Sequence, residues 1–131
     1  QRAGAVDTDT ILRELALDDV ADRHPATLSG GQKQRLAVAA CVAADKRILV
    51  FDEPTSGIDL DGMRRVARLL RRLAARGRAV LVITHDLELI ACACDRALHM
   101  DRGRIVARAQ VREDFDAVRA MTGAGAREGE E

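Results

Sequence analysis

Two acidic residues follow a short apolar segment, in a position where they could bind a metal ion and activate a water molecule. Residues 48–51 read Ile-Leu-Val-Phe, and Asp52 and Glu53 come directly after them. Because adjacent residues of a strand point in different directions, Asp52 can face a Mg²⁺ ion while Glu53 faces the water that attacks a γ-phosphate. Phosphoryl transfer requires both roles. The alternative for the pair is capping of the next helix or simple solvation at the strand end.

A second candidate segment, Leu-Ser-Gly-Gly-Gln at residues 28–32, has the composition of an anion-binding helix start. Glycines let backbone N–H groups approach an anion closely, and the positive end of the helix dipole favours negative charge there. The sequence therefore indicates a phosphate-binding helix N-terminus, with Ser29 as its cap. An ordinary serine-capped helix with a flexible entry is the alternative.

His85 ends a second apolar segment, residues 79–83, after one intervening threonine. At the end of a buried strand its imidazole could donate a hydrogen bond to a γ-phosphate and link that phosphate to Glu53. A packed or solvated strand-end histidine is the alternative. His24 and His99 stand apart from any partner pattern, and we assign them no role.

Apolar spacing and turn residues predict an α/β fold with a largely parallel sheet flanked by helices. The two apolar segments are predicted as strands buried on both faces. The four arginines of the central helix, at 64, 68, 72 and 76, are predicted to form a solvated stripe. The predicted helices are residues 10–22, 31–44, 60–76, 87–93 and 110–121, the strands are 48–51 and 79–83, and a hairpin joins 97–100 to 104–107.

Composition excludes several classes of protein. The chain has 131 residues, 47% of them hydrophobic, which is enough to bury a core. Its 21 basic and 21 acidic residues cancel, which argues against non-specific binding to nucleic acid or anionic membranes. No apolar segment approaches the roughly 20 residues that span a bilayer, and we expect an intracellular protein without a signal peptide. Cys41, Cys92 and Cys94 lie in apolar surroundings and are predicted to be buried thiols.

Taken together, the candidate segments resemble the motifs of ATP-binding cassette (ABC) ATPases, in the same order. The matching segments are LSGGQ at 28–32, ILVFDE at 48–53, SGID at 56–59 and TH at 84–85. The resemblance covers most of residues 10–108. It implies part of a P-loop NTPase fold, with a mainly parallel sheet and part of the helical subdomain that carries the signature motif.

The resemblance also implies a role for each matching residue. Asp52 would bind Mg²⁺, Glu53 would be the catalytic base and His85 the switch histidine. Ser56 and Asp59 would belong to the D-loop. The signature motif would bind the ATP that a second cassette holds, and it consists of Leu28, Ser29, Gly30, Gly31 and Gln32.

One motif of the family is missing from these 131 residues: no GxxxxGK[ST] segment occurs, and the two lysines, Lys33 and Lys46, follow no such loop. Without that loop nothing cradles the β- and γ-phosphates of ATP beside Asp52. We therefore expect residues 1–121 to be the C-terminal portion of one cassette, inactive alone, and residues 122–131 to be a disordered tail. The expected partners are a second cassette, arranged head to tail, and transmembrane subunits at the inner face of the cell membrane. A nucleic-acid partner is not expected.

Within the family, the chain is most similar to ATPase subunits of energy-coupling-factor importers, which take up vitamins or metal ions. The similarity lies in the continuation GQKQR, in DLELI after the switch histidine and in CDR before the hairpin. Other importer cassettes, non-transport ABC proteins and a non-catalytic partner cassette are the alternatives. Because Glu53 and His85 are present, the non-catalytic alternative is disfavoured.

Overall fold

The computed structural model describes residues 7–123, and they fall into two compact units. The first unit ends at Thr84 and the second begins at His85. The tail that was predicted to be disordered comprises residues 122–131, and from residue 124 onward it lies outside the described residues. None of the helices among residues 7–123 is long and apolar enough to cross a membrane.

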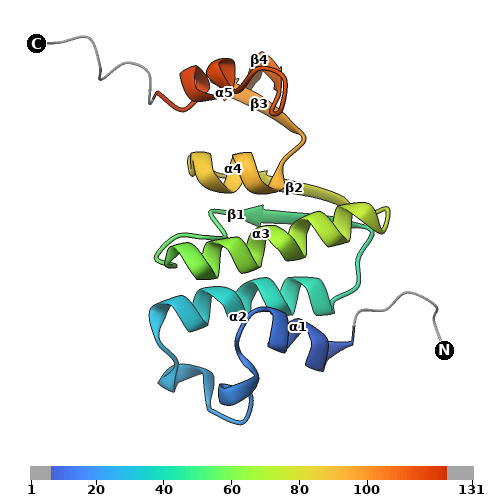
Figure 1. Ribbon diagram of the computed structural model, residues 1–131, viewed down its shortest axis with the longest axis vertical. Coiled ribbons are helices and arrows are strands. Elements are labelled where there is room, and N and C mark those ends of the chain that lie inside the picture. Colours follow the sequence, from blue (N-terminus) through green and yellow to red (C-terminus); the bar gives the residue numbers. More distant parts are fainter. Residues whose placement is uncertain (1–6, 124–131) are drawn as a thin grey trace, which may run out of the picture. The chain divides into compact units, whose positions relative to one another are not determined.

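The first unit contains a two-stranded parallel sheet with helices layered on one side (Figure 1). Strand β1 pairs with β2 in parallel, with Ile48 opposite Ala79 and Asp52 opposite Ile83. Helix α3 connects the two strands and packs on β2, α2 packs on α3 and β1, and α1 packs on α2. The elements are α1 (Thr8–Glu14), η1 (Asp18–Val20), η2 (Pro25–Thr27), α2 (Gly30–Ala43), β1 (Ile48–Asp52), α3 (Leu60–Ala75) and β2 (Ala79–Ile83).

Most predicted elements of this unit are confirmed, but the first helix is shorter than predicted. Helix α1 ends at Glu14, whereas the apolar spacing predicted a helix over 10–22. Ala16 adopts a left-handed conformation with φ 52°. Leu15 and Leu17 on either side of it are both buried. Residues two apart lie on different faces of a helix, so the chain must leave the helix to bury both leucines.

The prediction that both strands are buried on both faces is wrong. Leu49 and Phe51 are buried, whereas Ile48 and Val50, which point to the other face of β1, are 64% and 55% exposed. Side chains alternate between the faces of a strand, and the helices of this unit cover one face only. Within residues 7–84, the face of the sheet that carries Ile48 and Val50 is therefore apolar and uncovered.

The second unit is an antiparallel hairpin with two short helices (Figure 1). It contains α4 (Leu87–Ala93), β3 (Arg96–Asp101), β4 (Arg104–Gln110) and α5 (Phe115–Met121). The predicted hairpin is confirmed, and it turns at Arg102 and Gly103, which both have positive φ. The last helix begins five residues later than predicted, where Asp114 caps it by accepting a hydrogen bond from the Ala117 N–H.

The core of this second unit is small. Ile90, Val111 and Val118 form its buried cluster, and Phe115 packs against them. The three cysteines of the chain form no disulfide with one another. The prediction that all three are buried is wrong, because Cys92 is exposed and Cys41 and Cys94 are only partly buried.

Candidate functional site

The segment LSGGQ forms the start of α2 through a reciprocal pair of hydrogen bonds. The Ser29 Oγ accepts from the Gln32 N–H at 3.2 Å, and the Gln32 Oε1 accepts from the Ser29 N–H at 2.9 Å. This capping box confirms the predicted cap. Leu28, just before the helix, is buried, whereas Ser29 and Gly30 are exposed.

The exposed start of α2 can accommodate an anion. A Cβ on Gly30 would meet no atom within 4 Å, so the backbone there is open to an approaching group. The first-turn N–H groups of a 14-residue helix carry the positive end of its dipole. A phosphate oxygen is the kind of ligand that this geometry and charge suit.

The backbone of Glu53 is held in an uncommon conformation directly after β1. Glu53 has a φ of 46°, in the left-handed region that residues with a Cβ rarely adopt. Its N–H donates to the Ile83 carbonyl at 2.8 Å and its carbonyl accepts from the Ser56 N–H at 3.2 Å. The Gln34 side chain on α2 donates to the same Glu53 carbonyl, with Nε2 at 3.0 Å.

The carboxyl groups of Asp52 and Glu53 have different surroundings. The Glu53 Oε2 accepts a hydrogen bond from the Thr84 hydroxyl at 3.1 Å, and the residue is half-buried. Asp52 is exposed. Glu53 lies in the turn after β1 and not in the strand itself. The separate tasks of the two carboxyl groups stay a prediction.

The loop between β1 and α3 is closely packed around a few turns. Thr55 is buried and its carbonyl accepts from the Ile58 N–H at 3.1 Å, while Ser56 is exposed. The Asp59 Oδ1 accepts from the Gly62 N–H at 2.8 Å and so caps α3. Capping, the alternative weighed for the strand-end acids, is thus performed by Asp59.

The structure brings the start of α2 and the end of β1 together within the first unit. A Cβ on Gly31 would lie 3.6 Å from the Gly57 carbonyl oxygen, in ordinary van der Waals contact. One turn further along α2, Gln34 reaches Glu53. Sequence reasoning missed Gln34 and gave Thr84 no role of its own. The spacing of Gly31 and Gln34, three apart on one helix face, was a signal that could have placed Gln34 beside the loop.

His85 is exposed and is the first residue of the second unit. Asp86, next to it, caps α4 by accepting hydrogen bonds from the Glu88 and Leu89 N–H groups. The predicted link between His85 and Glu53 stays a prediction.

Asp52 fits the requirement of a magnesium ion for an accessible carboxylate. Mg²⁺ in nucleotide sites takes one or two carboxylates and completes its shell with water and phosphate oxygens. Among the described residues no group of three or more His, Cys, Asp or Glu side chains could hold a metal. Asp52 is thus a single accessible carboxylate, and residues 7–123 contain no all-protein metal cage.

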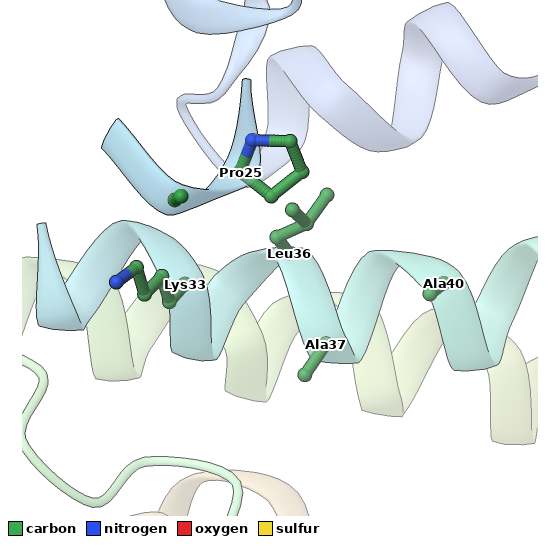
Figure 2. Close-up of a pocket in the computed structure, with 6 residues that line it drawn as sticks. Pro25, Lys33, Leu36, Ala37 and Ala40 are labelled. Atoms are coloured by element: carbon green, nitrogen blue, oxygen red, sulfur yellow. The ribbon is translucent and has the colours of Figure 1, made fainter. Parts of the chain in front are cut away.

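A shallow apolar hollow lies elsewhere on the first unit, between η2 and α2 (Figure 2). Its volume is about 420 Å³. Lys33 supplies its charged side chain, and it contains none of the acidic or hydroxyl groups that phosphoryl transfer uses. We assign it no catalytic function. Its lining residues are Pro25, Ala26, Lys33, Leu36, Ala37 and Ala40.

Comparison with known proteins agrees with this geometry. The family model for the ABC transporter matches residues 3–56, which include the start of α2 and the end of β1. The chain belongs to the ABC ATPase family. A putative ABC transporter ATP-binding protein of Treponema denticola is 53% identical over 98 residues, covering 75% of this chain and 20% of the relative.

Two further matches support the assignment. The energy-coupling factor transporter ATP-binding protein EcfA2 of Mycoplasma pneumoniae is 42% identical over 85 residues, which are 65% of this chain and 28% of that protein. The crystal structure of a nucleotide-free ATP-binding cassette from an ABC transporter superposes with a TM-score of 0.73 at 26% identity, covering 86% of this chain and 45% of that cassette. The chain thus spans less than half the length of each of these proteins.

Proposed function

We propose that this chain is the C-terminal portion, residues 1–121, of an ABC ATPase that binds and hydrolyses ATP to power a membrane transporter. The observation that carries the proposal is the hydrogen bond between Gln34 and the Glu53 carbonyl. It joins the helix that begins with LSGGQ to the strand end that bears Asp52 and Glu53, so one chain holds both motifs in a fixed arrangement.

Each residue has a role that its surroundings support. Exposed Asp52 holds Mg²⁺, which when bound neutralises charge on the phosphates. Half-buried Glu53, oriented by Thr84, accepts a proton from the attacking water. His85 contacts the γ-phosphate. The signature motif, residues 28–32 at the start of α2, binds phosphate oxygens of ATP that a partner cassette holds. Ser56 and Asp59 face that partner as the D-loop.

No GxxxxGK[ST] segment occurs in these 131 residues. We propose that another part of the cassette supplies the phosphate loop for this chain's own site and that the chain alone does not turn over ATP. The working assembly is a head-to-tail pair of cassettes bound to transmembrane subunits at the cytoplasmic face of the membrane.

We propose that the transporter is an energy-coupling-factor importer and that its substrate is a vitamin or a metal ion. The EcfA2 relative and the segments GQKQR, DLELI and CDR support this. Another importer class is the alternative, since the Treponema denticola relative has the higher identity and its name specifies no solute. A non-catalytic ABC protein is disfavoured by the presence of both Glu53 and His85.

Replacement of Glu53 tests the proposed catalysis. In the full-length protein, Glu53→Gln should keep ATP binding and lower turnover by at least about 100-fold, because the amide cannot accept the proton. ATP-dependent dimerisation, followed by light scattering, should persist. Glu88→Gln, an equivalent change at an exposed residue of α4, is the matched control. Normal turnover in the Glu53 variant would remove this residue from the catalytic role.

The in-trans role of the signature motif needs a mixed dimer. Ser29→Arg in one cassette places a large cation at the start of α2 and should disable hydrolysis of the ATP held by the other cassette. Nucleotide binding to the substituted cassette itself should be unaffected. The role is wrong if photo-crosslinking to labelled ATP is lost only from the substituted cassette.

A further inference from the structure

Glu53 has a strained main-chain conformation that neighbouring residues must hold in place. The inference drawn from this rests on the proposed function. A residue with a Cβ at a φ of 46° is strained, and it persists only where neighbouring groups fix it. A catalytic base must also be positioned closely, because a displacement of about 1 Å can lower a rate about 100-fold. The contacts of Glu53 therefore identify the residues on which its position depends.

The main chain of Glu53 is held from the side of α2. Its carbonyl accepts the Gln34 Nε2 at 3.0 Å, from a residue 19 positions earlier in the chain. The same face of α2 carries Gly31, whose Cβ position is 3.6 Å from the Gly57 carbonyl, and Arg35, whose Nη1 is 3.1 Å from the Cβ position of Gly62. Residues 31, 34 and 35 are neighbours on one helix surface. Gln34, Gly31 and Arg35 thus lie against the beginning, the middle and the end, in that order, of the stretch from Glu53 to the first turn of α3.

The side chain of Glu53 is held from the side of β2. The parallel register places Asp52 opposite Ile83, so the residues that follow, Glu53 and Thr84, also come together. The Thr84 hydroxyl donates to the Glu53 Oε2 at 3.1 Å. A hydrogen bond to a charged acceptor is directional and stronger than one between neutral groups, and it selects one orientation of the carboxylate.

We propose that Gln34 and Thr84 are positioning residues for Glu53. Gln34 fixes the strained main chain and connects it to the helix that begins with the signature motif. Thr84 fixes the direction of the carboxylate. Neither residue needs to contact ATP, so losing either hydrogen bond slows the chemical step and leaves ATP binding intact.

A pair of Thr84 variants tests the side-chain contact in the full-length ATPase. Thr84→Val has nearly the same shape but no donor, and kcat should fall about tenfold while the KM for ATP stays within about twofold. Thr84→Ser keeps the donor and should recover most of the rate. Wild-type kcat in the valine variant, or a serine variant as slow as valine, would overturn the role of Thr84.

Gln34→Met tests the main-chain contact, since methionine retains the length and helix propensity of glutamine without the donor. Turnover should again fall about tenfold at unchanged KM. Gln110→Met, the same change at an exposed residue of β4, is the matched control and should leave kcat unchanged. A rise in KM at constant kcat, or a Tm lowered in step with the rate, would assign Gln34 a merely structural role.

Different results would contradict the proposed function and the positioning roles of Gln34 and Thr84. A wild-type protein that hydrolyses no ATP in its assembled transporter overturns the proposed function and the positioning roles with it. An active wild type whose Thr84→Val and Gln34→Met variants both turn over at full speed overturns the positioning roles alone.

Discussion

Gly62, in the first turn of α3, lies at the point where the loop after β1 and two helices approach most closely. A Cβ at this position would lie 2.2 Å from the Ile58 Cγ2, 3.0 Å from the Asp59 Oδ1 and 3.1 Å from the Arg35 Nη1. The first distance is far below van der Waals contact, and Ile58 is β-branched, so it has few alternative rotamers. A side chain here must displace the loop that we assign to the D-loop.

We expect Gly62→Ala to destabilise the fold by about 1–3 kcal/mol, the usual range for overpacking. Gly30→Ala is the matched control, because nothing lies within 4 Å of its Cβ position, and alanine favours helix by roughly 1 kcal/mol. Denaturant unfolding of the full-length protein measures both. Equal stability of the two variants would mean that the loop adjusts to the extra methyl group.

A pH-dependent contribution is expected from Asp61, in the first turn of α3. The Arg65 Nε donates to its carboxylate at 2.7 Å, and this hydrogen bond lowers the pKa of Asp61 below its ordinary value of 3.8. Because the folded-state pKa is the lower one, ionised Asp61 stabilises the fold above the unfolded-state pKa, and this stabilisation is lost as the pH falls through the folded-state pKa.

Asp61→Asn should therefore lower Tm slightly at pH 7, and the difference from wild type should shrink as the pH falls through the folded-state pKa. The effect is small because the carboxylate is exposed and screened by water. Asp22→Asn, at an exposed position outside the helices, is the control. A Tm difference that grows toward acid pH would contradict the assigned sign.

At the scale of elements, α1 and α3 are joined by an ion pair in which the arginine is only partly compensated. Arg72 on α3 pairs with Glu14 at the end of α1. The Arg72 Nε and Nη2 are buried and have no hydrogen-bond partner in the described part of the chain. Burial, with the Arg76 charge as a smaller cause, lowers the pKa of Arg72. The guanidinium is thus desolvated and depends on Glu14 for compensation.

Removing one partner should therefore harm the fold more than removing both. Glu14→Ala should destabilise by about 1–2 kcal/mol, discounted from the fully buried case because both side chains are about one-third exposed. Arg72→Met should destabilise the fold less, because the methionine side chain keeps the apolar packing of the arginine stem. The double variant should recover most of the stability that Glu14→Ala loses. A double-mutant cycle by chemical unfolding measures the coupling. Additive losses would show that the pair does not compensate the buried charge.

The elements that sequence predicted well are those whose pattern is local. Helices α2 and α3 have clear caps, and the strands end at abrupt polar segments. The sequence-based predictions were wrong where tertiary packing determines the structure. Helix α1 ends early because Leu15 and Leu17 are both buried. Arg72 was predicted to be solvated, but it is half-buried where α1 packs near it. The same holds for the site, where a motif identifies Glu53, but its positive φ and its bond to Gln34 depend on how α2 meets the loop.

At the scale of the whole chain, each unit presents uncovered apolar side chains on a sheet. In the first unit they lie on the face of β1 and β2 away from α3, and in the second they lie on the hairpin. The balance of 21 basic and 21 acidic residues supplies no net repulsion to keep such faces apart. The exposed residues are Ile48, Val50, Leu81 and Ile83 in the first unit and Leu98, Met100, Ile105 and Val106 in the second.

The 131-residue chain alone should consequently self-associate at micromolar concentration, because contiguous apolar patches and unpaired strand edges favour association. Val50 and Leu81 are opposite each other across the parallel pair and are 55% and 53% exposed, so they form the centre of the first face. The double variant Val50→Thr/Leu81→Thr places β-branched residues, which suit strands, at both positions and should shift the chain toward monomer in sedimentation velocity.

A matched control separates the sheet face from apolar exposure in general. Leu60→Thr removes a leucine that is 47% exposed at the start of α3, outside either strand, and should leave the association unchanged. If the rest of a cassette covers the β1–β2 face in the full-length protein, the double threonine variant should there destabilise the fold, because it removes buried methyl groups worth about 1 kcal/mol each. Opposite effects of one variant on the isolated chain and on the full-length protein are therefore the expected result. A monomeric wild-type chain, or a full-length protein that tolerates both threonines, would mean that this face is a true exterior surface.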